Sequence, residues 1–179
     1  MAGMRLRRDP TPTATGTATF YWIHVGHRNT AIQLAIGLIR DAATREIATV
    51  PADVFTEMGG VMTNWAIESL LQGAWLREYH VWERDTKRHF NNIHLRNGGK
   101  KIEWKRNAQS HVAKVRQQLK LFSVTMSPDI LSAIDGARVK INTAKHEDDI
   151  WASEADYQLL VASVQRFWQE LEPQEIWER

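Results

Sequence analysis

The chain has no cysteine among its 179 residues, which excludes disulfide bridges, thiolate metal sites, iron–sulfur clusters and a cysteine nucleophile. It also lacks a run of about 20 apolar residues, the length that a membrane-spanning helix needs. Residues 1–19 include several arginines but no apolar stretch after them, so they do not resemble a secretory signal. We therefore expect a cytoplasmic protein that has no membrane partner.

Several sequence motifs of catalytic and metal sites are also missing. There is no glycine-rich phosphate loop, no dinucleotide-binding G-x-G-x-x-G and no H-E-x-x-H. His146 to Asp149 are metal-binding residue types, but four consecutive helical residues point in different directions. His24 and His27 have no acidic ligand near them in the sequence, and we interpret them as polar residues beside the core. We expect no cofactor and no metal ion.

Apolar periodicity and eight tryptophans predict an all-α protein with an aromatic-rich core or interface. The expected architecture is a four-helix-bundle-like core with an extra N-terminal helix. The proline, threonine and glycine content of residues 1–19 predicts a flexible arm, and we expect residues 20–179 to form a single helical domain. The expected helices are 29–50, about 63–90, about 107–124, from Pro128 to the His146 region, and from Ser153 to Pro173.

Turn and cap signals separate these helices. In 29–50, strand-like alternation competes with a helical pattern, and the alanine content favours the helix. The segment 51–55 and Gly59-Gly60 predict breaks, and the residues 91–92 and 97–99 predict a turn-rich connection. Ser127 and Ser153 are the expected N-caps of the last two helices, the latter in a capping box with Asp156.

Three acidic residues fall on the apolar stripe of the helix expected over 63–90. They are Glu68, Glu78 and Asp85. Because an unpaired buried carboxylate is costly, we expect them at the solvent edge of that stripe.

Charge is unevenly distributed along the chain, although the net charge is only +2. From Arg84 to Lys120 there are eleven Lys or Arg against Asp85 and Glu103, a net charge of +9. From Glu147 to Arg179 the net charge is −7. This asymmetry indicates an anionic partner or self-association through opposite ends. The expected nucleic-acid-binding residues are Lys87, Arg88, Lys100, Lys101, Lys105 and Arg106.

A polar stripe lies where the fourth expected helix ends. Arg138, Asn142 and His146 recur at four-residue steps, so they share a slowly drifting line on an α-helix. Arginine binds phosphate oxygens and histidine transfers protons near neutral pH. The stripe is either a site that acts on RNA or a polar helix surface.

The Asn142-x-x-x-His146 motif before an amphipathic final helix resembles the HEPN superfamily (higher eukaryotes and prokaryotes nucleotide-binding), over a core of about 63–172. Many members have an R-x4-6-H motif; here Ile141 occupies the expected Arg position, and Arg138 lies one turn earlier. Arg84 and His89 have the full spacing and form an alternative site, but residues five apart on a helix point about 140° away from each other. We favour His146.

The resemblance implies a metal-independent ribonuclease that acts as a dimer, as a toxin or antiviral defence effector, with an antitoxin or regulatory protein as a further partner. His146 would be the base towards the 2′-OH, Arg138 would neutralise phosphate charge and Asn142 would orient the substrate. The alternatives are a catalytically inactive module that binds nucleic acid or protein, which Ile141 favours, and a helical assembly scaffold.

Overall fold

The computed structural model describes residues 17–47, 56–104, 110–144 and 152–172. Within these ranges all regular structure is helical, which confirms the all-α prediction. The elements are α1 (Thr17–Ile47), α2 (Thr56–Arg96), α3 (His111–Leu121), α4 (Pro128–Ala144) and α5 (Glu154–Leu171). None of these described helices is both long enough and apolar enough to cross a membrane.

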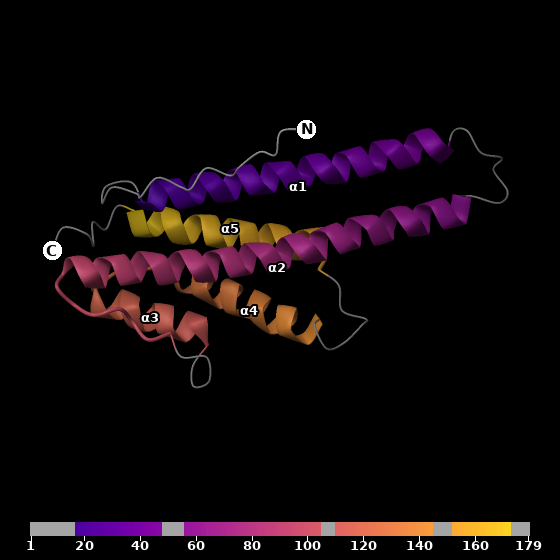
Figure 1. Cartoon of the computed structure of the whole chain (residues 1–179). Helices are drawn as coiled ribbons and strands as arrows, with labels where there is room; N and C mark the ends of the chain where they lie inside the picture. The colour runs from indigo at the N-terminus through magenta and orange to yellow at the C-terminus, as the bar shows by residue number, and fades with distance from the viewer. Residues whose placement is uncertain (1–16, 48–55, 105–109, 145–151, 173–179) are drawn as a thin grey trace.

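The helices form a bundle around α5. α1 and α2 lie side by side, and α5 contacts α1, α2 and α4 (Figure 1). α3 and α4 pack on the other side of α2 from α1 (Figure 1). α2 has 41 residues and a length of about 61 Å, so it spans the molecule. The C-terminal half of α1 and the N-terminal half of α2 extend beyond the end of α5 (Figure 1).

The core of the bundle is rich in aromatic side chains, as the tryptophan content predicts. Trp82 and Phe167 are fully buried, with ring centroids 5.6 Å apart in an edge-to-face contact. Such pairs stabilise a core beyond their buried area by about 0.5–1.5 kcal/mol. Trp65 differs, because 64% of its surface is exposed.

α1 begins twelve residues before the expected start at Asn29. Its additional turns bury Tyr21 and Val25, and the ring centroid of Tyr21 lies 4.3 Å from that of Trp168. Tertiary packing thus overrides the weak helix propensity of this segment. Residues 17–19, expected in the flexible arm, belong to α1, and the rest of that arm lies outside the described residues.

α2 continues through both predicted interruptions. Gly59 and Gly60 lie in its first turns, and the second predicted break is bridged because Ile93 is buried and Asn91 Oδ1 accepts a hydrogen bond from Ile102 N. The helix ends at the predicted turn, where Gly98 has a φ of +72°. Residues 51–55 lie outside the described residues.

The starts of α4 and α5 lie where the cap signals predict. Ser153 and Asp156 form a complete capping box at α5, and Pro128 is the first residue of α4. Ser127 occupies the N-cap position of α4, where its backbone C=O accepts from Ile130 N at 3.2 Å and its hydroxyl donates to Glu170 Oε1 at 2.8 Å. α3 starts at His111 with Ser110 as its N-cap, and residues 105–109 before it lie outside the described residues.

Candidate nucleic-acid interface

The predicted polar stripe on α4 is described only in part. Arg138 is half-buried and its Nε donates to Asp135 Oδ1 at 2.8 Å, while Asn142, one turn later, is exposed. His146 lies outside the described residues. The structure therefore places Arg138 and Asn142 on neighbouring turns of one helix.

Ile141 has a structural role in the bundle. Only 1% of its surface is exposed, and it belongs to the same core as Ile130 and Ile134. A position that faces the core cannot offer a guanidinium to a substrate without a change in packing. In this chain the arginine of the stripe is therefore Arg138, which lies at the edge of the buried face.

The structure does not bring the alternative pair Arg84 and His89 together. The Arg84 side chain is 67% exposed and pairs with Asp85 at 2.8 Å. His89 is buried against Trp168, with ring centroids 5.4 Å apart. Burial lowers the pKa of His89 to about 3, with a smaller effect from Arg96, so its imidazole is neutral at physiological pH.

The expectation that the stripe acids lie at the solvent edge is wrong for Glu78 and Asp85. Glu78 is 2% exposed and accepts two hydrogen bonds from Arg28, at 2.6 Å to Oε2 and 2.5 Å to Oε1. Asp85 is 6% exposed and pairs with Arg84. Cations from α1 and α2 compensate these charges, which a reading of the α2 periodicity alone cannot show.

A row of exposed arginines, the α2 cation stripe, consists of Arg77, Arg84 and Arg88. Steps of seven and four residues keep them on one side of the helix, over an axial distance of about 16 Å. The first half of α2, from Thr56 to Leu76, contains no Lys or Arg. Positive charge on α2 therefore begins at Arg77 and continues to the C-terminal end.

The segment after α2 adds two exposed lysines to the same end of the molecule. Residues 97–104 fold back along α2, since Ile102 N donates to Asn91 Oδ1 at 2.9 Å. This segment carries Lys100 and Lys101 and ends at Trp104. The half-buried Trp104 ring lies 4.8 Å from the His111 ring, between centroids.

The Trp104–His111 pair lies in a positive field. Burial, together with the nearby charges of Lys87 and Lys114, lowers the pKa of His111 to about 3. These two lysines come from α2 and α3, so both helices contribute cations around the pair.

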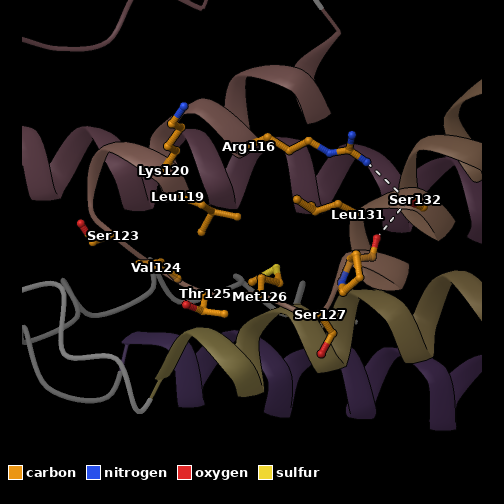
Figure 2. Close-up of a pocket in the computed structure, with 11 residues that line it drawn as sticks. Arg116, Leu119, Lys120, Ser123, Val124, Thr125, Met126, Ser127, Leu131 and Ser132 are labelled. Atoms are coloured by element: carbon orange, nitrogen blue, oxygen red, sulfur yellow. Dashed lines mark hydrogen bonds between the residues drawn. The ribbon is translucent and has the colours of Figure 1, made fainter.

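A groove of about 550 Å³ lies where α3 turns into α4 (Figure 2). Arg116 and Lys120 of α3 line it, and Arg116 Nη2 reaches Ser132 Oγ at 3.4 Å. Leu119 and Leu131 provide apolar surface. The groove has four hydroxyl groups, on Ser123, Thr125, Ser127 and Ser132. Sequence reasoning did not single out this groove, although the run of hydroxyl residues over 123–127 was its visible signal.

Many cations of this region have no acidic partner among the residues whose structure is described. Within the described ranges, no carboxylate oxygen lies within 4.0 Å of Arg77, Lys87, Arg88, Arg96, Lys100, Lys101, Arg116 or Lys120. The predicted residues Lys105 and Arg106 lie outside the described residues. The same part of the chain holds no group of three His, Asp or Glu side chains suited to a metal ion.

Comparisons with protein-family models, curated proteins and solved structures find no match to this chain.

Proposed function

We propose that the protein binds single-stranded RNA through the basic end of the bundle. This surface consists of the C-terminal half of α2, the segment 97–104 and α3. The observation that carries the proposal is the set of exposed cations in this region that have no carboxylate partner among the described residues. Unpaired cations can release counterions from a phosphate backbone, which supplies most of non-specific nucleic-acid affinity.

Two further features favour a single strand. Proteins that bind single strands combine a cationic track with aromatic side chains on which bases stack. The half-buried Trp104 ring lies 4.8 Å from that of His111, whose pKa is lowered in part by the nearby charges of Lys87 and Lys114, so an aromatic side chain is available close to two cations. The α2 cation stripe is one helix wide, which suits one backbone better than a duplex.

The test is fluorescence anisotropy with a labelled single-stranded RNA at low salt. In Lys100→Glu/Lys101→Glu we expect at least a tenfold loss of affinity, because two phosphate contacts become repulsive. Arg45→Glu is the control, since Arg45 is exposed near the opposite end of the molecule, in the last turn of α1 (Figure 1). The double variant changes the net charge by −4 and Arg45→Glu by −2, so a loss of log affinity in Arg45→Glu at least half as large as in the double variant would show a net-charge effect and contradict the proposed surface.

Cleavage of the bound RNA is the second proposal, as a metal-independent HEPN-type ribonuclease in a toxin or defence role. The placement of Arg138 and Asn142 on adjacent turns of α4, at its surface, supports it. Two positions eight residues apart on one continuous helix are separated by about 12 Å in rise, and we infer that a two-fold dimer brings His146 of one chain towards Arg138 of the other.

Cleavage of a structured RNA in EDTA tests this second proposal. Loss of cutting in His146→Ala supports it, with a folded state verified by circular dichroism. His89→Ala serves as the comparison, because His89 is buried and we expect it to affect stability rather than the reaction. If the wild-type protein binds RNA but cuts nothing, the binding module is the correct function.

A further inference from the structure

A second pocket, of about 290 Å³, opens between α1 and α2. Four nitrogen-bearing side chains line it, His24, His27 and Arg28 from α1 and Arg77 from α2. Ala31 and Ala74 are small residues and leave its interior open. Ligand pockets in proteins have volumes of about 300–1,000 Å³, and this one lies at the lower end of that range, which limits it to a small group.

The electrostatics of the pocket favour an anion. Arg28 and Glu78 neutralise each other, and Arg77 adds one positive charge without a carboxylate partner among the described residues. Two of the five Arg28 N–H donors bond Glu78, so the guanidinium edge retains donors for a ligand. Burial, and secondarily Glu78, raise the pKa of Tyr157 to about 12, so it lines the pocket as a neutral hydroxyl.

The buried ion pair between Arg28 and Glu78 also indicates that this pocket binds a ligand. Glu78 is 2% exposed, and an apolar pair of similar size would stabilise a helix interface at least as well. The Arg28–Glu78 pair fixes a guanidinium at the wall of a pocket, which an apolar pair cannot do. A role in positioning Arg28 for a ligand would explain why the helix interface contains a buried ion pair and not an apolar pair.

The pocket also lies at one end of the positive surface. Arg77 lines the pocket and is the first cation of the α2 cation stripe. Towards the N-terminus, α2 has no Lys or Arg over the 21 residues from Thr56 to Leu76. A backbone that follows the cations along α2 therefore reaches the pocket where the cations stop.

We propose that this pocket binds the terminal phosphate monoester of an RNA strand whose backbone lies along the α2 cation stripe. This inference rests on the proposed RNA binding. A monoester carries a charge of about −1.5 to −2 near neutral pH, more than an internal diester, and Arg77, Arg28 and His27 provide donors for its oxygens. The same chemistry is present at a 5′- or a 3′-phosphate, and the test distinguishes them.

The experiment compares three RNA 12-mers of one sequence, with a 5′-phosphate, a 3′-phosphate or hydroxyl groups at both ends. We expect one phosphorylated strand to bind about tenfold more tightly than the hydroxyl strand, the effect of one or two charge-assisted hydrogen bonds. Ala31→Glu places a carboxylate in the pocket and should abolish this preference. Ala42→Glu is the matched control, because Ala42 is an exposed alanine three turns further along α1, outside the pocket.

Equal affinities for the three strands would overturn the inference while leaving RNA binding intact. A preference for the phosphorylated strand that is equally large in Ala31→Glu and Ala42→Glu would also overturn the inference. If the protein binds no RNA, a titration with adenosine 5′-monophosphate against adenosine decides the matter. A shift of the His27 ring resonances with the monophosphate alone supports the pocket, and identical spectra with both compounds contradict it.

Discussion

Loss of the buried carboxylate in Glu78→Leu should destabilise the fold by about 2–3 kcal/mol. Breaking a fully buried ion pair costs about 3–5 kcal/mol, because the remaining charge has no partner. The Arg28 side chain is 24% exposed, so water compensates part of its charge and the cost falls below that range. For a chain of this length, 1 kcal/mol shifts the Tm by about 2–4 °C, so we expect a decrease of about 4–12 °C.

Thermal and urea unfolding of the wild type and four variants, followed by tryptophan fluorescence, measures this coupling. Arg28→Leu should cost more than Glu78→Leu, because Glu78 is the more buried partner, at 2% against 24% exposure. The double variant should return to within about 1 kcal/mol of the wild type, since an apolar pair replaces the ion pair. Arg40→Leu is the control, because its pair with Glu154 is exposed and contributes less than about 1 kcal/mol. Additive losses in the double variant would refute the reasoning.

Three other predictions concern stability. Gly98→Ala should destabilise the fold by about 1 kcal/mol because Gly98 has a φ of +72°. Gly73→Ala, at a helical position with no atom close to the added Cβ, should stabilise it by about 0.5–1 kcal/mol. Urea unfolding should therefore show changes of opposite sign in the free energy of unfolding. Ser127→Ala should cost about 1 kcal/mol in the same assay through the lost bond to Glu170, and an unchanged midpoint would contradict it. The pKa of His89 is lowered to about 3 in the folded protein, so between pH 6.5 and 3 this histidine is protonated only in the unfolded chain. The free energy of unfolding therefore decreases as the pH is lowered through this window. His89→Phe should flatten that dependence by up to about 1.4 kcal/mol per pH unit, and parallel pH profiles would exclude it.

The helical class and the inward faces follow from local patterns. Val112, Val115 and Leu119 of α3 lie in the core at the three- and four-residue spacing of one helix face, and Ser153 and Asp156 form the capping box that the sequence predicts. These features depend on neighbours within about one helical turn, where periodicity and side-chain chemistry decide the outcome.

Features that depend on distant partners were not predictable in the same way. Ser127 is recognisable as the residue before a helix, but the hydrogen bond from its hydroxyl to Glu170, 43 residues later, is not. Glu78 looks like a solvent-edge acid until Arg28, 50 residues earlier, pairs with it. The first turns of α1 have little helical propensity and depend on the contact between Tyr21 and Trp168.

The same distinction between local patterns and distant partners applies to the candidate sites. The excess of basic residues between Arg84 and Lys120 is visible in the sequence, and the structure adds that many of these cations lack a carboxylate partner within the part of the chain that it describes. The α1–α2 pocket was not visible, because His24 and His27 become neighbours of Arg77 only when two helices pack.

The measurement that tests RNA binding most directly is the Kd for a single-stranded RNA as a function of salt concentration. Contacts from Arg77, Lys87, Arg88, Lys100 and Lys101 to five phosphates predict a slope of log K against log salt of about −3.5. Lys100→Gln/Lys101→Gln should reduce that slope to about −2, while Arg45→Gln should leave it unchanged. A slope near zero, or the same slope in all three proteins, would contradict binding at this surface.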